Sequence, residues 1–402
     1  MSTQWNRRDF LRRAAGTAAA AGLAGTGSWA GTQPTPVGDM SRRTLGRTGL
    51  QVPVISLGVM NASNPALLRR AWDLGVRHFD TAAYYQRGRN EEMVGEVMQE
   101  LNARDEVVIA TKIYLPPERR HIADEEVRQF FLNSAEESLR RLRMDHVDIL
   151  YVHNVSDIDY LYRPVVVEVM QALKQAGKAR FIGFTTHRGM DPCIAAAAER
   201  GGWDVIATAF NYSLGEDKDL LQAMARAHEQ GLGLVAMKTQ CTQYWYREHL
   251  PDYFQRFYQG EILHTAVLKW AVRHPFVTTA IPGCTTFEQL EADVQAGRTL
   301  EYTAAEREFL ESRNVRAALS YCRQCARCVA GCPAGVQVPT LMRAHLYAVC
   351  YGNHDALQAA LAEIPPGAGL EACRDCQTCR VTCVRGIPVA ERLAELQRIV
   401  RV

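Results

Sequence analysis

Several features that identify common classes of protein are missing from this sequence. The 46 basic and 44 acidic residues leave a formal net charge of only +2, so we expect none of the strongly basic faces that bind nucleic acid. Outside the N-terminal leader described below, no stretch is apolar enough for a bilayer-spanning helix, which needs about 20 predominantly apolar residues. No Gly-x-Gly-x-x-Gly fingerprint of a Rossmann sheet occurs. We therefore expect no nucleic-acid partner and no membrane span in the mature chain.

The N-terminal segment is typical of an export signal. Residues 6–12 read NRRDFLR, and an Ala- and Gly-rich stretch follows them. A charged start, a short apolar region and small residues before a cleavage point form the layout of a secretory signal. Arg7 and Arg8 resemble a twin-arginine address, which a receptor reads and which is not an anchor. We expect residues 1–33 to be this signal and the protein to be periplasmic; an uncleaved membrane tether and an ordinary basic helix are the alternatives.

Cysteine gives the strongest signal. The chain has 12 cysteines, and eight of them form two runs with the same C-x2-C-x2-C-x3-C spacing, CRQCARCVAGC at 322–332 and CRDCQTCRVTC at 373–383. An exported protein with many cysteines usually holds a disulfide framework, but this repeat argues against one. Zinc sites usually show paired C-x2-C units a dozen or more residues apart. The spacing is that of bacterial ferredoxins and predicts two [4Fe–4S] clusters.

The ferredoxin rule also predicts which cysteines share a cluster. In two-cluster ferredoxins the fourth cysteine of each run ligates the other cluster. The first predicted set is Cys322, Cys325, Cys328 and Cys383, and the second is Cys373, Cys376, Cys379 and Cys332. Apolar residues at helical spacing between the runs predict helices, so residues 313–402 are expected to form a mostly helical ferredoxin-like domain. A cluster assembled in the reducing cytoplasm would explain export of a folded protein.

The segment between leader and cysteines predicts a barrel. From about residue 41 to 300, short β-rich runs alternate with amphipathic helical ones. The strand candidates are VISLG at 54, VRHFD at 76, EVVIATK at 106, HVDILYVH at 146, ARFIGFT at 179, VIATAFN at 205, GLVAMKT at 233 and TTAIPG at 278. Eight βα repeats without the Rossmann fingerprint favour an α/β fold of the (β/α)8 TIM-barrel type, which we assign to residues 34–312. RRTLGRTGLQV at 42–52 predicts a hairpin that plugs the barrel floor.

Polar residues stand at the ends of neighbouring predicted strands, where TIM barrels place reactive groups. Asp80, Lys112 and His153 end the second, third and fourth strands, and Tyr84 and Tyr85 follow Asp80. A lysine beside a phenol lowers the phenol's pKa from about 10. A phenol tuned in this way can protonate an oxygen that receives a hydride. For any one residue the alternative is structural, as an ion pair or a packed histidine, but the four together favour catalysis.

Three segments carry a resemblance to a known family. FDTAAYYQRGRNEEMVGEVM (79–98), VVIATK (107–112) and VDILYVHN (147–154) resemble signature segments of the aldo-keto reductase superfamily. The resemblance implies interconversion of a carbonyl and an alcohol on a small-molecule substrate with NAD(P)H. The cysteine-rich tail resembles a subgroup in which this barrel is fused to a ferredoxin-like module.

The resemblance also implies a role for each strand-end residue. The family's catalytic Tyr follows the Asp by five positions, which selects Tyr85 as the general acid. Lys112 would tune Tyr85, Asp80 would hold Lys112, and His153 would orient the carbonyl.

The residues at the family's nicotinamide contacts depart from its pattern. Thr185 and Thr186 stand where a Ser-Asn pair holds the carboxamide, and Asn211 lies four residues beyond the position where a Gln is expected. Gly283 stands where Lys or Arg binds the 2′-phosphate. A 2′-phosphate without such a residue loses charge-assisted hydrogen bonds of about 1.5–3 kcal/mol each. These four residues are the candidate cofactor contacts, and they fit NADPH poorly.

Two functions are consistent with the sequence. The first is an exported oxidoreductase of aldo-keto reductase type, whose clusters exchange electrons with a redox partner protein. The second is an iron–sulfur electron-transfer or interaction subunit whose barrel no longer uses nicotinamide. Tyr244, Trp245 and Tyr246 belong to an aromatic-rich insertion at 240–260. These aromatics would stack on a substrate, or cover the barrel mouth and dock the ferredoxin-like module.

Overall fold

The computed structural model describes residues 39–240, 255, 260–373, 376 and 379–400. The predicted export signal, residues 1–33, lies outside the described residues, as do the aromatic residues 244–246. In the part of the chain that the structure does describe, no helix combines the length and apolar character needed to cross a bilayer.

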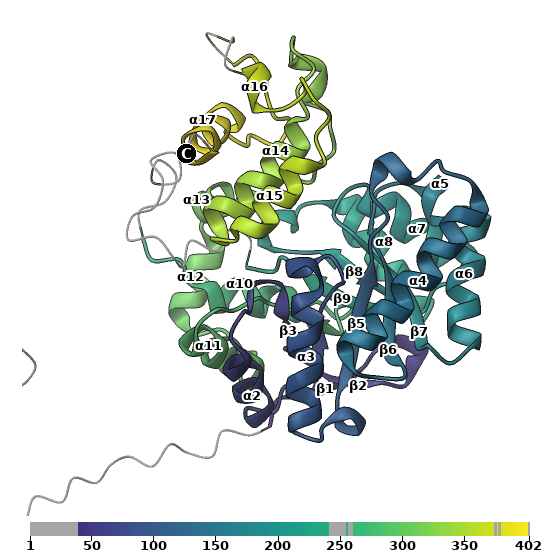
Figure 1. Cartoon of the computed structure of the whole chain (residues 1–402). Helices are drawn as coiled ribbons and strands as arrows, with labels where there is room; N and C mark the ends of the chain where they lie inside the picture. The colour runs from purple at the N-terminus through teal and green to yellow at the C-terminus, as the bar shows by residue number, and fades with distance from the viewer. Residues whose placement is uncertain (1–38, 241–254, 256–259, 374–375, 377–378, 401–402) are drawn as a thin grey trace, which may run out of the picture. The chain divides into compact units, whose positions relative to one another are not determined.

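Eight parallel strands form the centre of the fold (Figure 1). They are β3 (Leu57–Gly58), β4 (His78–Asp80), β5 (Val108–Ile113), β6 (Val147–Val155), β7 (Ala179–Thr186), β8 (Val205–Ala209), β9 (Gly233–Met237) and β10 (Thr279–Ala280). Each strand pairs with the next along the chain. A parallel bridge between Ile55 and Ala280 closes the ring, and the Ser56 N–H donates to the Ala280 carbonyl at 2.8 Å. The predicted (β/α)8 barrel is confirmed.

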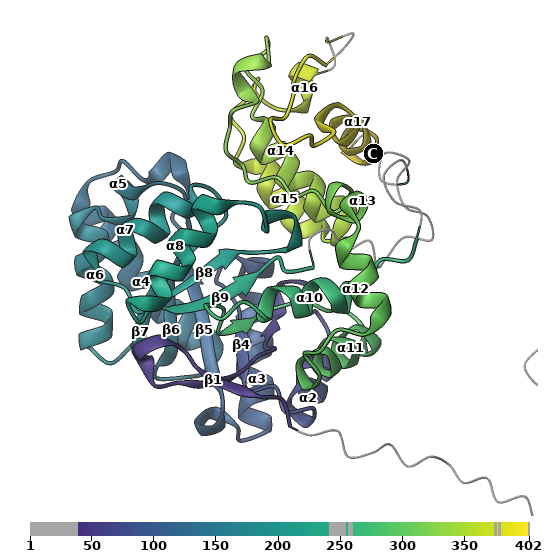
Figure 2. The ribbon, with the colours of Figure 1, turned by 180° about the vertical axis from the view of Figure 1, so that it is seen from behind.

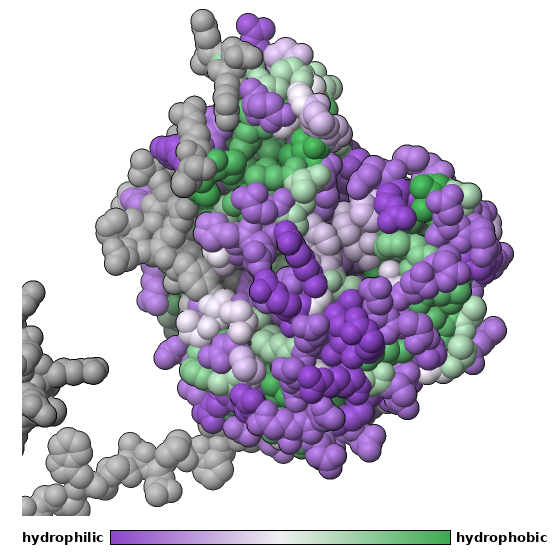
Figure 3. All heavy atoms as spheres, in the orientation of Figure 1, coloured by the Kyte–Doolittle hydropathy of each residue, from purple (hydrophilic) through white to green (hydrophobic). Residues whose placement is uncertain are grey.

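Helices surround this sheet because each has one apolar stripe to bury. Those of the barrel are α2 (Pro65–Asp73), α3 (Arg89–Glu100), α4 (Asp124–Leu142), α5 (Ile158–Leu161), α6 (Pro164–Gln175), α7 (Met190–Arg200), α8 (Lys218–Glu229), α10 (His264–Val272) and α11 (Phe287–Arg298). In α4, Val127, Phe131 and Ala135 repeat every four residues and are buried. Figure 3 shows mainly hydrophilic residues on the outer side of the barrel helices in that view.

A hairpin fills the end of the barrel at which the strands begin, as predicted. Its strands β1 (Arg42–Thr44) and β2 (Gln51–Pro53) pair antiparallel. Leu45 between them packs with inward-facing barrel residues and is fully buried. Gly46 has φ +52, and a Cβ there would lie 2.4 Å from the Gly231 carbonyl oxygen. Only glycine permits this close approach.

The C-terminal region is mostly helical. After α12 (Ala304–Glu311) and α13 (Arg313–Ala318), it contains α14 (Val338–His345), the π-helical turn Leu346–Cys350, α15 (His354–Ala362), α16 (Leu370–Cys373) and α17 (Val389–Val400). These helices have an apolar core of their own, with Val338, Leu341 and Leu396 fully or almost fully buried. Figures 1 and 2 both show α14 and α15 beyond the strand ends that carry the predicted catalytic residues. The helices therefore cover the mouth of the barrel.

Candidate active site

A buried ion pair organises the mouth of the barrel. Lys112 of β5 donates from Nζ to the Asp80 carboxylate at the end of β4, and also to the Thr81 carbonyl oxygen at 2.6 Å. Both charged side chains are 1–2% exposed. The same ammonium lies 4.9 Å from the ring centroid of Tyr85, which begins the 3-10 turn Tyr85–Gly88. The pair thus holds the strand end and the loop that presents the phenol.

His153 completes the predicted group of four. It lies in β6, and its ring meets that of Tyr85 edge to face, with centroids 5.8 Å apart. Its Nδ1 is buried and has no hydrogen-bond partner among the described residues. Asp80, Tyr85 and His153 all line one cavity, and Lys112 lies directly beneath it. The structure therefore brings together all four residues singled out from the strand ends.

The electrostatics of this group differ from the sequence-based expectation in one respect. Burial and the Asp80 carboxylate raise the pKa of Tyr85 well above 10, so the expected lowering by Lys112 was wrong. The charge of Lys112 faces Asp80 and is offset by it. Burial, with Lys112 as the next cause, lowers the pKa of His153 well below 6.5. At neutral pH the site therefore presents a protonated phenol and a neutral imidazole, which is the charge state of a proton donor with a neutral hydrogen-bonding neighbour.

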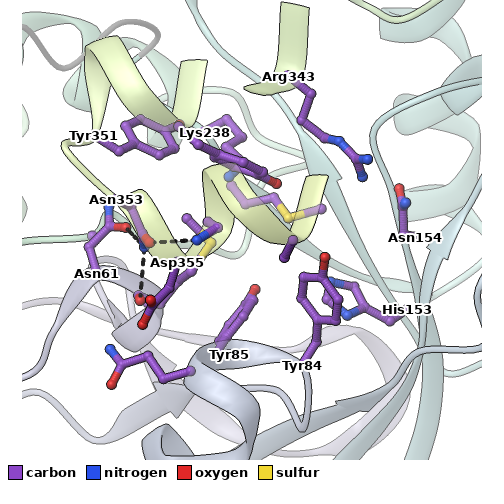
Figure 4. A pocket seen from close by; sticks show the side chains of 18 of the residues that line it. Asn61, Tyr84, Tyr85, His153, Asn154, Lys238, Arg343, Tyr351, Asn353 and Asp355 are labelled. Atoms are coloured by element: carbon purple, nitrogen blue, oxygen red, sulfur yellow. Dashed lines mark hydrogen bonds between the residues drawn. The ribbon is translucent and has the colours of Figure 1, made fainter. Parts of the chain in front are cut away.

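The cavity has a volume of about 1070 Å³ and lies between the barrel and the C-terminal helices. From the barrel it is lined by Tyr84, Tyr114, His187 and Lys238, in addition to the predicted residues. Figure 4 shows the side chains of Tyr84 and Tyr85 rising from the same loop into this space. A cavity of this size holds a small-molecule ligand with room to spare.

The C-terminal region forms the roof of this cavity. Arg343 of α14 and Glu363, just after α15, form an ion pair there, with side chains 10% and 14% exposed. The Tyr84 hydroxyl donates to the same Glu363 carboxylate at 3.2 Å. Asn353 donates from Nδ2 to the Asn61 side-chain oxygen at 2.9 Å, a bond drawn in Figure 4. The roof is thus tied to the barrel loops by specific polar contacts.

Three of the four predicted nicotinamide contacts do not reach the cavity. The Thr185 hydroxyl oxygen accepts the Asn154 N–H at 2.8 Å, and the Thr186 hydroxyl donates to the Arg188 carbonyl at 3.0 Å. The Asn211 amide donates to the Lys238 carbonyl at 3.2 Å. Only Gly283 lines the cavity. The threonine and asparagine side chains are hydrogen-bonded to backbone groups, so in this arrangement they do not fit the binding of a carboxamide.

Sequence reasoning missed two cations that line the same cavity as the predicted group of four, Lys238 and Arg343. Lys238 directly follows β9, so the rule that reactive residues end barrel strands could have found it. Arg343 lies between the two cysteine runs. Nothing in its local sequence indicates that α14 docks on a barrel.

Several cysteines of the two runs lie near one another. Cys322, Cys325, Cys328 and Cys383 line one small pocket. Cys332, Cys376 and Cys379 are the charged neighbours that raise the pKa of Cys373, after burial. The N–H groups of Gln324 and Arg385 point at the Sγ atoms of Cys322 and Cys383, each at 3.4 Å. Among the described residues, no group of three or more His, Cys, Asp or Glu is gathered tightly enough to hold a single metal ion.

The cysteine pocket and the barrel cavity share a helix. Met342 of α14 lines the pocket with the four cysteines. The next residue, Arg343, lines the barrel cavity. The two sites therefore border neighbouring faces of one helix.

Comparison with known proteins agrees with this geometry. Residues 57–242 match the model of the aldo/keto reductase family. L-galactose dehydrogenase of Arabidopsis thaliana is 26% identical over 297 residues, which are 67% of this chain and 91% of that protein. L-glyceraldehyde 3-phosphate reductase of Escherichia coli (strain K12) is 34% identical over 169 residues, 38% of this chain and 47% of that protein. The segment of residues 57–242 therefore belongs to the aldo/keto reductase superfamily.

Solved structures show the same fold. An aldo-keto reductase from Bacillus halodurans, in its holo form, has a TM-score of 0.55 at 20% identity and covers 70% of this chain and 98% of its own. One from Klebsiella pneumoniae, in complex with NADPH, has a TM-score of 0.51 at 23% identity and covers 69% of this chain and 95% of its own. At these identities the likeness concerns the barrel architecture.

The buried ion pair generates a stability prediction. Lys112→Met leaves the Asp80 carboxylate buried without its partner, so it should lower the free energy of unfolding by about 3–5 kcal/mol. The double variant Asp80→Asn/Lys112→Met retains no buried charge and should lose less than Lys112→Met alone. Chemical unfolding followed by circular dichroism measures both. Lys178→Met, at a partly exposed pair with Glu136, is the control, and equal losses for the single and double variants would contradict the assignment.

Proposed function

We propose that this protein interconverts a carbonyl and an alcohol on a small polar substrate, with Tyr85 as the proton donor and acceptor. The observation that carries the proposal is the buried Lys112–Asp80 pair beneath Tyr85, with His153 beside it on the same cavity. This constellation agrees with the superfamily of the barrel. Similar proteins include an L-galactose dehydrogenase and a D-threo-aldose 1-dehydrogenase, which supports a hydroxylated substrate.

Each residue of the group has a distinct task in the proposed reaction. In reduction, a hydride from a nicotinamide or another two-electron donor would reach the carbonyl carbon, and the Tyr85 hydroxyl would donate a proton to the carbonyl oxygen. Burial raises the pKa of Tyr85 above 10, so the phenol keeps its proton at neutral pH until then. Lys112, 4.9 Å from the ring centroid and paired with Asp80, holds the loop that positions the phenol. The neutral imidazole of His153 orients the substrate oxygen. In the direction of alcohol oxidation the same proton returns to Tyr85.

Tyr85→Phe tests the proton donor. Because general acid–base catalysis contributes typically about 10²–10⁴-fold, this variant should lose activity by that factor. The assay is turnover of the best substrate in a panel of aldoses and hydroxy acids, with NADH, NADPH or a two-electron dye as partner.

Tyr84→Phe is the matched control for this measurement. Its hydroxyl bonds to Glu363, and losing one such bond should cost no more than about tenfold. If Tyr84→Phe is the more damaging change, the assignment of Tyr85 is wrong.

We further propose that the C-terminal region holds two [4Fe–4S] clusters and that the protein is exported folded to the periplasm. The shared pocket of four cysteines, and the backbone N–H groups directed at two of the sulfurs, fit cluster ligation. Such clusters exchange single electrons, in this case with a redox partner protein. The twin arginines of the N-terminal segment support the export route.

The ligand sets can be tested independently of activity. Cys383→Ser should remove the same cluster as Cys322→Ser, and Cys373→Ser should remove the other, because the fourth cysteine of each run crosses over. Each variant should lose about half of the iron and acid-labile sulfide. The electron paramagnetic resonance spectrum of the reduced protein then identifies the cluster that remains. A Cys383→Ser spectrum that matches Cys373→Ser instead would show that each run ligates its own cluster.

A second function is favoured by one specific observation, which is that Thr185, Thr186 and Asn211 use their side chains on the backbone. In that function the chain is an iron–sulfur electron-transfer or interaction subunit whose barrel no longer uses nicotinamide. The similar structure from Klebsiella pneumoniae was solved in complex with NADPH, which supports the first function, the oxidoreductase, instead.

Anaerobic titration of the cluster-loaded protein with NADH and NADPH decides between these functions. Three of the expected nicotinamide contacts do not reach the cavity. We therefore expect NADH and NADPH to bind with a Kd at least about tenfold above 1 μM, the value that corresponds to about −8.2 kcal/mol. We also expect little preference for NADPH, because Gly283 provides no cation for a 2′-phosphate. Nicotinamide fluorescence reports the binding. Tight binding with a strong preference for NADPH would contradict this expectation and exclude the second function.

A further inference from the structure

Among the residues that the structure describes, one partly buried cation of the roofed cavity has no matching anion. Lys112 is paired with Asp80, and Arg343 is paired with Glu363. Lys238 lines the same cavity, and no described carboxylate lies within ion-pair distance of its ammonium. Even a partly buried charge without a partner is costly, so this lysine requires an explanation.

The chain holds Lys238 in place by unusual means. Its backbone has φ +58, a left-handed conformation that residues other than glycine rarely adopt. Its carbonyl oxygen accepts a hydrogen bond from the Asn211 side-chain amide. Its ammonium lies 5.1 Å and 4.8 Å from the ring centroids of Tyr347 and Tyr351, both from the roof. Strained residues of this kind cluster at functional sites. The cation–π contacts place the charge at the roof without neutralising it.

Arg343 retains unused hydrogen-bond donors beside this lysine. Its Nη2 donates to Glu363, while its Nε is buried without a partner among the described residues. Figure 4 shows the guanidinium directed toward Asn154, above Tyr84 and His153. The side chain can therefore donate to a further acceptor inside the cavity.

The pKa values of the two imidazoles that line the cavity are lowered by the same nearby cations. Burial, followed by the charges of nearby cations, lowers the pKa of both His153 and His187 well below 6.5. Lys112, Lys238 and Arg343 are cations that contribute to both shifts. Such a field favours a ligand that brings a negative charge.

We propose that Lys238 and Arg343 together bind the carboxylate of a small hydroxylated acid, in chemical class a sugar acid. One uncompensated cation matches one carboxylate, whereas a phosphate monoester carries up to two negative charges at neutral pH. The ligand's carbonyl or alcohol then faces Tyr85, and its hydroxyls meet Tyr84 and Asn154. That the ligand is a substrate rests on the proposed function, but its binding is measured without turnover.

The site should bind an acid best below neutral pH. Burial, then the charges of Arg343 and Lys112, lower the pKa of Lys238 to about 7, and Asp80 opposes this shift. The other titratable or charged groups that line the cavity are Tyr84, Tyr85, Arg87, Arg89, Tyr114, His153, His187, Tyr347, Tyr351, Asp355 and Glu363. Lys238 is charged below pH 7 and loses its proton above it. Affinity for a carboxylate should therefore be full below pH 7 and fall as the pH rises.

Calorimetry on the full cluster-loaded chain tests this site, with galacturonate as the anionic probe and galactose as its neutral match. We expect galacturonate to bind at pH 6, more weakly at pH 8.5, and galactose to bind at least about tenfold more weakly, which is the effect of a charge-assisted hydrogen bond. Lys238→Met should weaken galacturonate binding by a similar factor and abolish its pH dependence. Glu363→Gln, which frees Arg343, should tighten it. Lys178→Met is the control for a lysine lost elsewhere.

The other outcomes separate the alternatives. If inorganic phosphate binds more tightly than galacturonate, the assignment of a carboxylate as the ligand is wrong. NADPH binding that Lys238→Met weakens, with no binding of galacturonate, would assign the two cations to dinucleotide phosphates. Equal binding of galactose and galacturonate would remove the anion site altogether. Tyr85→Phe should retain galacturonate binding, so loss of turnover in that variant with binding unchanged separates the proposed reaction from this site.

Discussion

The pairing of one lysine with one aspartate inside the barrel is the constraint around which the rest of this site is arranged. Lys112 and Asp80 come from adjacent strands and are both shielded from water. Each would be costly to bury alone. Their contact, together with the bond to the Thr81 carbonyl, fixes the start of the loop that carries Tyr84 and Tyr85. The phenol that faces the cavity is thus positioned by a charge pair beneath it.

The C-terminal helices are part of this site as well as a separate apolar core. They bring an arginine, a glutamate and two tyrosines to a barrel mouth that in a plain barrel is built from loops. The hydrogen bond from Tyr84 to Glu363 joins the loop that carries Tyr84 and Tyr85 to this roof. Arg343 of the roof also contributes, after burial and the charges of Lys112, His187 and Lys238, to the lowered pKa of His153.

Much of the fold and part of the site were predictable from the sequence. The alternation of short strands and amphipathic helices, and the hairpin at 42–52, follow from local patterns. Asp80, Lys112 and His153 follow from the rule that parallel strands end at one rim. The orientation of Thr185 could not be predicted, because a hydroxyl at a strand end bonds either to a ligand or to a neighbouring backbone. Arg343 could not be predicted either, since docking of one helix on a distant barrel leaves no periodic trace.

The helix α14 borders the cysteine pocket with Met342 and the barrel cavity with the next residue, Arg343. An α-helix with its side chains is about 10 Å wide. Across that width, one unit of charge acts on another with about 1.7 kcal/mol at an effective dielectric constant of about 20. If the proposed clusters are bound by these cysteines, gain or loss of one electron there would shift the affinity of the cavity for an anion by more than tenfold. Ligand affinity would then depend on the redox state of the clusters.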